Sequence, residues 1–349
     1  MYFSRFGLTL YFEFRDEENP VDRRRFLFTL GGAGGLAALG ALPAWRTRGL
    51  EKTERRSRAL GAEVSITALH EDLRQAERAV DAAFEELERI EEVMSLYRPH
   101  SQLSTLNRDG VLENPHPYLV QVLRAGTDLS RSSGGAFDVT VQPLWALYSE
   151  AKRSGRLPER AAIEEATRRV DWRRVEISPE RIRLGAGMSI TLNGIAQGFA
   201  ADRVRAALEA RGVRHALVDT GEFGVLGRKA DGTPWTLGIQ HPRRPDAYVA
   251  LARLEGRFLS TSGDYATSFS EDFRHHHIFD PRTGLSPTEF SSVSVAARTG
   301  MESDALTKVL FVLGLEKGLE RLRATPGADA LVVFKDGRVL STEGFPRLA

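Results

Sequence analysis

The stretch TLNGIAQGFAADRV, residues 191–204, indicates most directly how the chain folds. Its first residues are typical of a strand end, a glycine turn follows, and a helix is expected over residues 194–211. The backbone amides at Gly194 to Ala196 would lie at the helix start and could bind a phosphate group. Gly194 and Gly198 are four residues apart, so close packing of this helix against a sheet is an equally good interpretation.

Short strands and helices alternate irregularly on both sides of this stretch. A helix is predicted after a strand at residues 62–69, because apolar residues recur every three or four positions from Val80 to Met94. Other helices are expected over residues 118–132, 303–313 and 316–324, and KDGR at 335–338 predicts a hairpin. Further strands are expected at residues 175–177, 182–184, 188–192, 216–218, 235–239, 248–254 and 292–297. This mixture predicts a single α+β domain over residues 59–344.

The composition is that of a globular protein without a strong charge. Of the 349 residues, 42% are hydrophobic and 27% are charged, and the formal net charge is +1. This charge gives no general attraction to nucleic acid or anionic lipid, so polyanion-binding proteins are disfavoured. The absence of cysteine excludes disulfides, thiol nucleophiles and thiolate zinc sites, but leaves the compartment open.

The segment DRRRFLFTLGGAGGLAALGALPA, residues 22–44, admits two interpretations. A strand leading into a dinucleotide-binding glycine loop would need a second strand, but residues 45–58 are polar and basic. An export signal needs a basic start, an apolar run and a small residue for cleavage, and residues 23–25, 26–42 and Ala44 supply them.

Arg23-Arg24-x-Phe26-Leu27 also has the twin-arginine pattern. Residues 1–48 are therefore predicted to be an N-terminal extension with a twin-arginine-type signal peptide, followed by a basic linker to about Arg58. The alternative is an uncleaved membrane anchor.

Three other segments hold more glycine, small polar residues and isolated charges than packing requires. MSLYRPHSQLSTLN, residues 94–107, places Tyr97 at a helix end, where it either faces a ring-shaped ligand or packs in the core. GGAFDVTVQP, residues 134–143, puts Asp138 beside an apolar wall after paired glycines, although it also resembles an ordinary loop. The third segment consists of STSGDYATSF, residues 260–269, and HHHIFDPRTG, residues 275–284. Side chains alternate along an extended chain, so the three histidines cannot all face one metal, and a shaped loop is favoured.

These segments, in this order and together with ESDALTKVLFVLG at residues 302–314, resemble the ApbE family of FAD:protein FMN transferases over about residues 59–344. The most specific pieces are HIFDPRTG, NGIAQGF and the GxFD pattern that ends at Asp138. The resemblance implies an ApbE-like fold and a Mg²⁺-dependent enzyme. This enzyme would transfer FMN from FAD to a threonine or serine hydroxyl of a target protein and release AMP. The alternatives are an exported FAD-binding protein without transfer activity and an FAD pyrophosphatase that yields FMN and AMP.

The resemblance also implies site residues, carried over by position. His277 is the candidate base, with an ordinary pKa of about 6.5. Asp304 and the Gly194 carbonyl are implied to hold Mg²⁺ through hard oxygen ligands, with Thr307 and Lys308 beside them. The FAD site is implied to consist of Tyr97, Ala136, Phe137, Asp138, Thr191, Gln197 and Ile278. The implied acceptor is a membrane redox subunit that faces the periplasm.

The chain departs from the family pattern, which usually has aspartate at Thr191, lysine at Gln197 and threonine at Lys308, and Met-Gly-Thr where Leu60-Gly61-Ala62 stands. A charged lysine cannot ligate Mg²⁺. Either Thr307 or water then replaces the missing ligand, or Lys308 supplies part of the charge of the metal. Asp304, at the start of an expected helix, is also a good capping residue, so helix stability alone could explain it.

Overall fold

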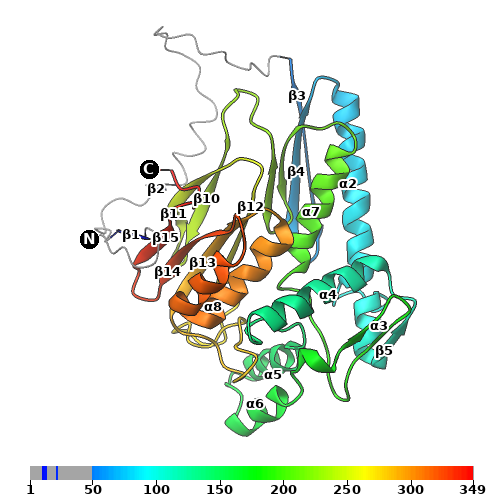
Figure 1. Ribbon diagram of the computed structural model, residues 1–349, viewed down its shortest axis with the longest axis vertical. Helices are drawn as coiled ribbons and strands as arrows, with labels where there is room; N and C mark the ends of the chain where they lie inside the picture. The colour runs from blue at the N-terminus through cyan, green and yellow to red at the C-terminus, as the bar shows by residue number, and fades with distance from the viewer. Residues whose placement is uncertain (1–9, 14–20, 23–48, 349) are drawn as a thin grey trace.

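A nine-stranded antiparallel sheet forms the centre of the computed structural model, which describes residues 10–13, 21–22 and 49–348 (Figure 1). Its strands, in spatial order, are β1 (Leu10–Glu13), β15 (Val339–Thr342), β14 (Asp329–Phe334), β13 (Phe290–Ala297), β12 (Phe258–Gly263), β9 (Phe223–Leu226), β8 (His215–Asp219), β4 (Ala62–His70) and β3 (Glu51–Ala59). The pairing of β12 with β9 divides this sheet into two halves. It consists of only two residue pairs, Phe258–Gly224 and Leu259–Phe223.

Two three-stranded sheets flank the central one. The first consists of β10 (Trp235–His241), β11 (Arg244–Leu254) and β2 (Val21–Asp22), and the second of β5 (Val111–Glu113), β7 (Arg181–Arg183) and β6 (Glu176–Ile177). The first sheet buries its apolar side chains with those of β14 and β15, in a cluster that includes Leu237, Val249, Leu331 and Val339.

The long helices α2 (Leu73–Met94), α7 (Ala196–Glu209) and α8 (Gly300–Arg323) cover the central sheet (Figure 1). The buried stripe of α2, with Val80, Leu87 and Ile90, packs against β4 and α7, as its sequence periodicity predicts. The shorter helices are α3 (Gln102–Asp109), α4 (Pro117–Ser132), α5 (Gln142–Arg153), α6 (Arg160–Thr167) and the 3-10 turn Trp172–Arg174. Among the described residues, none of the helices is long and apolar enough to cross a membrane.

Helices α7 and α8 touch backbone to backbone. A Cβ atom on Gly198 would lie 2.1 Å from the carbonyl oxygen of Gly300, and one on Gly300 would lie 2.3 Å from that of Gly198. The close-packing interpretation of Gly198 is therefore correct, although its partner is a helix and not a sheet. This contact brings the start of α7 against the second turn of α8, where the site lies.

The predicted α+β class is confirmed, but two of the predicted segments are wrong. Residues 188–192 do not form a strand, because the Asn107 side chain bonds the amide and carbonyl of Ile190 at 2.7 and 2.8 Å in place of a neighbouring strand. The predicted basic linker is in fact β3, whose charged residues lie on an exposed sheet edge, where Glu54 contacts Lys52 and Arg56.

The boundaries of α8 also differ from the expected ones. The helix begins at Gly300, three residues earlier than predicted, and the two expected helices are joined across a break at Gly314, where φ is 75° and ψ is −177°. Residues 23–48, which contain the predicted signal sequence, lie outside the described residues.

Candidate active site

A cavity of about 280 Å³ opens where the two halves of the central sheet meet α7 and α8. Its wall is contributed by residues 136–145, 191–197, 221–222, 261–281 and 308–312. Most of the segments that stood out in the sequence are thus brought to one place. The predicted site residues on this wall are Ala136, Phe137, Asp138, Thr191, Gly194, Gln197, His277, Ile278 and Lys308.

Three predicted site residues lie off the wall. Asp304 and Thr307 are fully buried on α8, directly behind the side chain of Lys308. Tyr97 is 73% exposed in the bend after α2, where its ring lies beside Gly61. The structure therefore does not place Tyr97 among the residues of the cavity.

Asp138 is tied to its own loop. Its carboxylate accepts hydrogen bonds from the amide and hydroxyl of Thr140, at 2.8 and 2.6 Å, and from the amide of Trp172 at 3.1 Å. Burial raises the pKa of Asp138, while these donors favour the ionised form. These bonds fix the conformation of the loop at residues 138–140, and Asp138 and Val139 of this loop line the cavity.

The start of α7 differs from the predicted phosphate seat. The amides of Ile195 and Ala196 both donate to the carbonyl of Leu192, at 3.0 and 2.8 Å. Two of the three expected amides are therefore occupied, and that prediction is wrong for them. The turn instead places Gly194 and Gln197 on the cavity wall.

Asp304 caps a helix other than its own. The first residue before α7, Ile195, has no capping side chain, and Asp304 Oδ2 on α8 accepts the amide of Gly198 at 3.0 Å. In return, Asp202 on α7 accepts the amides of Gly300 and Met301 at the start of α8, at 2.7 and 2.9 Å. The expectation that Asp304 caps its own helix is wrong, since Thr299 does so.

Lys308 lies against the other oxygen of this carboxylate. Its ammonium contacts Asp304 Oδ1 and donates to the Asp304 carbonyl at 3.2 Å, and only 18% of its side chain is exposed. A Cβ atom on Gly194 would lie 3.7 Å from Lys308 Cε, so the lysine stem covers the α7 turn. The structure therefore shows Lys308 as an ion-pair partner.

Glu222, in the turn after β8, is a wall residue that was not predicted. Burial and the nearby Asp304 carboxylate raise its pKa well above the ordinary value, while Lys308 acts in the opposite direction. The sequence signal for it is DTGEFG, residues 219–224, where a glycine and an acid follow a buried strand. The backbone conformation of this turn favours glycine, because Gly221 has a φ of 92°.

His277 is a neutral base within the cavity wall. Burial, followed by the neighbouring His276 and Lys308, lowers its pKa to about 4 instead of the expected 6.5. Its Nδ1 lies 3.3 Å from the carbonyl of Thr267, which can only accept, so Nδ1 carries the proton and Nε2 the lone pair. At neutral pH the ring can therefore accept a proton.

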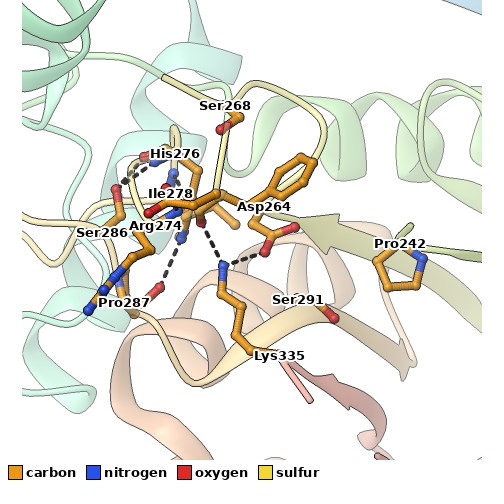
Figure 2. A network of polar contacts seen from close by, with 12 residues as sticks. Pro242, Asp264, Ser268, Arg274, His276, Ile278, Ser286, Pro287, Ser291 and Lys335 are labelled. Atoms are coloured by element: carbon orange, nitrogen blue, oxygen red, sulfur yellow. Dashed lines mark hydrogen bonds and ion pairs between the residues drawn. The ribbon is translucent and has the colours of Figure 1, made fainter. Parts of the chain in front are cut away.

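A buried ionic network that includes Asp264 and Lys335 lies near His276, the residue before His277 (Figure 2). Asp264 is fully buried, and its carboxylate receives both terminal nitrogens of Arg243 at 2.7 Å and the ammonium of Lys335 at 2.5 Å. Lys335 also donates to the carbonyl of Phe273 at 2.6 Å.

His276 is held by residues 286 and 287. Its Nε2 donates to the Pro287 carbonyl at 2.9 Å, and its amide donates to the Ser286 hydroxyl at 2.8 Å (Figure 2). His276 is thereby turned away from the cavity while His277 faces it, as alternation along the chain predicts.

Comparison with known proteins assigns the family. The ApbE family profile matches residues 60–332. The chain belongs to the ApbE family. It is 33% identical over 291 residues to the FAD:protein FMN transferase of Treponema pallidum, covering 76% of this chain and 80% of that protein. It is 30% identical over 302 residues to that of Haemophilus influenzae, covering 81% and 85%.

Solved structures of the ApbE family have the same fold. The ApbE protein of Thermotoga maritima superposes with a TM-score of 0.77 at 28% identity, covering 85% of this chain and all of that one. The flavinyl transferase ApbE of Pseudomonas stutzeri gives a TM-score of 0.73 at 29% identity, covering 84% and 96%. The cavity described above therefore lies in an ApbE fold.

Proposed function

We propose that this protein transfers the FMN part of FAD to a serine or threonine hydroxyl of an acceptor protein and releases AMP. The observation that carries the proposal is His277, a neutral imidazole on the cavity wall whose Nδ1–H is held by the Thr267 carbonyl. Its relatives from Treponema pallidum and Haemophilus influenzae are named for this transfer. A cavity that holds FAD would meet the apolar side chains of Phe137 and Ile278.

The proposed step is a displacement at phosphorus. The acceptor oxygen forms a bond to the phosphorus on the FMN side of the pyrophosphate, and the bond from that phosphorus to the bridging oxygen breaks. AMP leaves with the bridging oxygen, and the hydroxyl proton passes to Nε2 of His277. Atoms and charge balance without a redox partner, and the product is a phosphate ester between FMN and the acceptor.

The test is to incubate the purified protein with FAD and a candidate acceptor domain, in parallel with Mg²⁺ and with chelator. We expect a covalent FMN mass increase on the acceptor, and we expect His277→Gln to reduce its rate by about 10²-fold or more, as is usual for a lost general base. Free FMN without acceptor labelling would favour the pyrophosphatase. Bound but uncleaved FAD would favour the binding protein.

His275→Gln is the matched control, because His275 is only two residues from His277 in the sequence but is not among the residues that line the cavity. It should label the acceptor at the rate of the unaltered protein.

The acceptor and the compartment follow from the same proposal. A signal of the twin-arginine type at residues 23–27 supports export of the folded enzyme to the periplasm. We propose that its acceptors are membrane redox subunits with domains in that compartment.

A further inference from the structure

The cavity already contains a cation that belongs to the chain. The ammonium of Lys308 contacts Asp304 Oδ1 and lies 3.2 Å from the Asp304 carbonyl, and the side chain reaches the cavity wall. Its stem lies over Gly194, whose carbonyl was predicted to be a metal ligand. The lysine therefore occupies the surroundings that the resemblance assigned to Mg²⁺.

The residues present do not fit a divalent metal in this arrangement. Asp304 Oδ2 accepts the Gly198 amide at 3.0 Å, and its other oxygen contacts the ammonium. The Thr307 hydroxyl donates to the Asp304 carbonyl at 2.6 Å and is 2.6 Å from the Ser262 hydroxyl. Among the described residues there is no group of three or more histidine or acidic side chains that could hold a metal.

Electrostatics lead to the same conclusion. A Mg²⁺ ion bound to Asp304 Oδ1 at about 2.1 Å would lie within a few ångströms of an ammonium, and both charges would be largely shielded from water. The ion pair therefore excludes the metal as long as Lys308 stays on Asp304.

We propose that Lys308 itself is the cation of this site, that its ammonium binds the pyrophosphate of FAD, and that the protein needs no divalent metal. The inference rests on the proposed function for the identity of the ligand. An ammonium has three donors, and Asp304 takes two of them, through Oδ1 and its carbonyl, which leaves one for a phosphate oxygen in the cavity.

The test is the dissociation constant of FAD, measured by flavin fluorescence or calorimetry in millimolar Mg²⁺ and in excess chelator. For the unaltered protein we expect the same value in both solutions, and no saturable heat when Mg²⁺ alone is titrated. Lys308→Met should weaken FAD binding by about tenfold or more in both solutions, as for a lost charge-assisted hydrogen bond. Lys308→Arg should retain most of the affinity.

Lys308→Thr is the decisive variant, because it frees one oxygen of Asp304 and adds a hydroxyl. It should bind FAD weakly in chelator and regain affinity when Mg²⁺ is added. Because loss of Lys308 leaves a buried carboxylate without its cation, the thermal melting of every variant is recorded alongside. The comparison of the two solutions for the unaltered protein does not depend on any variant.

The outcomes separate this inference from the proposed function. FAD binding by the unaltered protein that requires Mg²⁺ overturns the inference and leaves the proposed function in place. Chelator-resistant FAD binding without acceptor labelling in either solution supports the inference and overturns the transferase. Failure to bind FAD in either solution overturns both.

Discussion

At the scale of single residues, His277 links the environment of the cavity to its chemistry. Burial, His276 and Lys308 all disfavour the charged imidazolium, and the pKa falls to about 4. A histidine with this pKa is unprotonated over the whole physiological range, so a general base at this position, as we propose, would be available near neutral pH.

This environment predicts the pH dependence of the transfer reaction. Because kcat/KM reports the ionisation of the free enzyme, it should stay level as pH falls from neutrality and decline only as pH passes through about 4. Lys308→Met removes a positive charge near the imidazole, so it should move this acid limb to higher pH. Rates from acceptor labelling across pH measure both effects.

His275→Gln should leave the position of the acid limb unchanged, because the titratable groups that shift the His277 pKa are His276, Lys308 and Asp264. A midpoint near 6.5 for the unaltered protein would show that the His277 environment is more hydrated than the structure indicates.

Much of the cavity wall was predicted from the sequence, but the hydrogen-bond and ion-pair partners of its side chains were not. Phe137, Thr191, Gln197 and Ile278 line the cavity, in keeping with the positions that the family resemblance implied. Asp138 and Asp304 also have distant partners, the amides of Trp172 and Gly198, which lie 34 and 106 residues away, so no local pattern could reveal these two bonds. The sequence shows that Lys308 departs from the family pattern, but only the structure shows that it is the ion-pair partner of Asp304.

At the scale of elements, α7 and α8 hold each other's ends. Asp304 on α8 caps α7, Asp202 on α7 caps α8, and Gly198 and Gly300 allow the two backbones to touch. This reciprocal capping satisfies amides that each helix leaves free at its start. The carboxylate beside the cavity is therefore also part of the helix interface.

Gly198→Ala tests this interface. An alanine methyl would lie 2.1 Å from the Gly300 carbonyl oxygen and 2.7 Å from Asp304 Cβ, so the helices must separate. We expect a loss of about 1–3 kcal/mol in the free energy of unfolding, measured by urea denaturation, despite the better helix propensity of alanine. FAD affinity should fall as well, since Asp304 and Lys308 shift with α8.

Ala206→Gly on the exposed face of α7 is the control. It should cost only the helix propensity of about 1 kcal/mol and leave FAD affinity intact. A Gly198→Ala protein as stable as the unaltered one would show that the helix contact is looser than described.

Element prediction succeeded where the period of apolar residues was clear and failed where a side chain replaced a strand partner. The apolar stripe of α2 and the alternation of apolar and polar residues in β4 were both predicted from the sequence. Residues 188–192 have the composition of a strand, but their backbone bonds go to Asn107 and to Val139. Charged β3 lacks an apolar face, and its pairing with β4 is visible only in the structure.

At the scale of the whole molecule, the N-terminal segment predicts export of the protein. The route proposed from residues 23–27 carries folded proteins. Replacing Arg23 and Arg24 by lysine should retain full-length precursor in the cytoplasm, as measured by fractionation and immunoblotting. N-terminal sequencing of the exported protein shows whether it is cleaved near Ala44.

A second precursor with Arg25→Lys is the control, because it changes a neighbouring arginine outside the pair. It should be exported normally. Normal export of the double-lysine form would exclude the twin-arginine route.

The pairing between the two halves of the central sheet has a consequence for folding of the chain during its synthesis. Strand β4 finds its partner β8 only after residue 219 has been made, and β9 joins β12 through two residue pairs. The cavity wall runs from residue 136 to residue 312, so a growing chain cannot complete the cavity until the ribosome has passed residue 312 of α8. Pairings this distant in sequence are slow to form, and the site is therefore completed among the last events of folding.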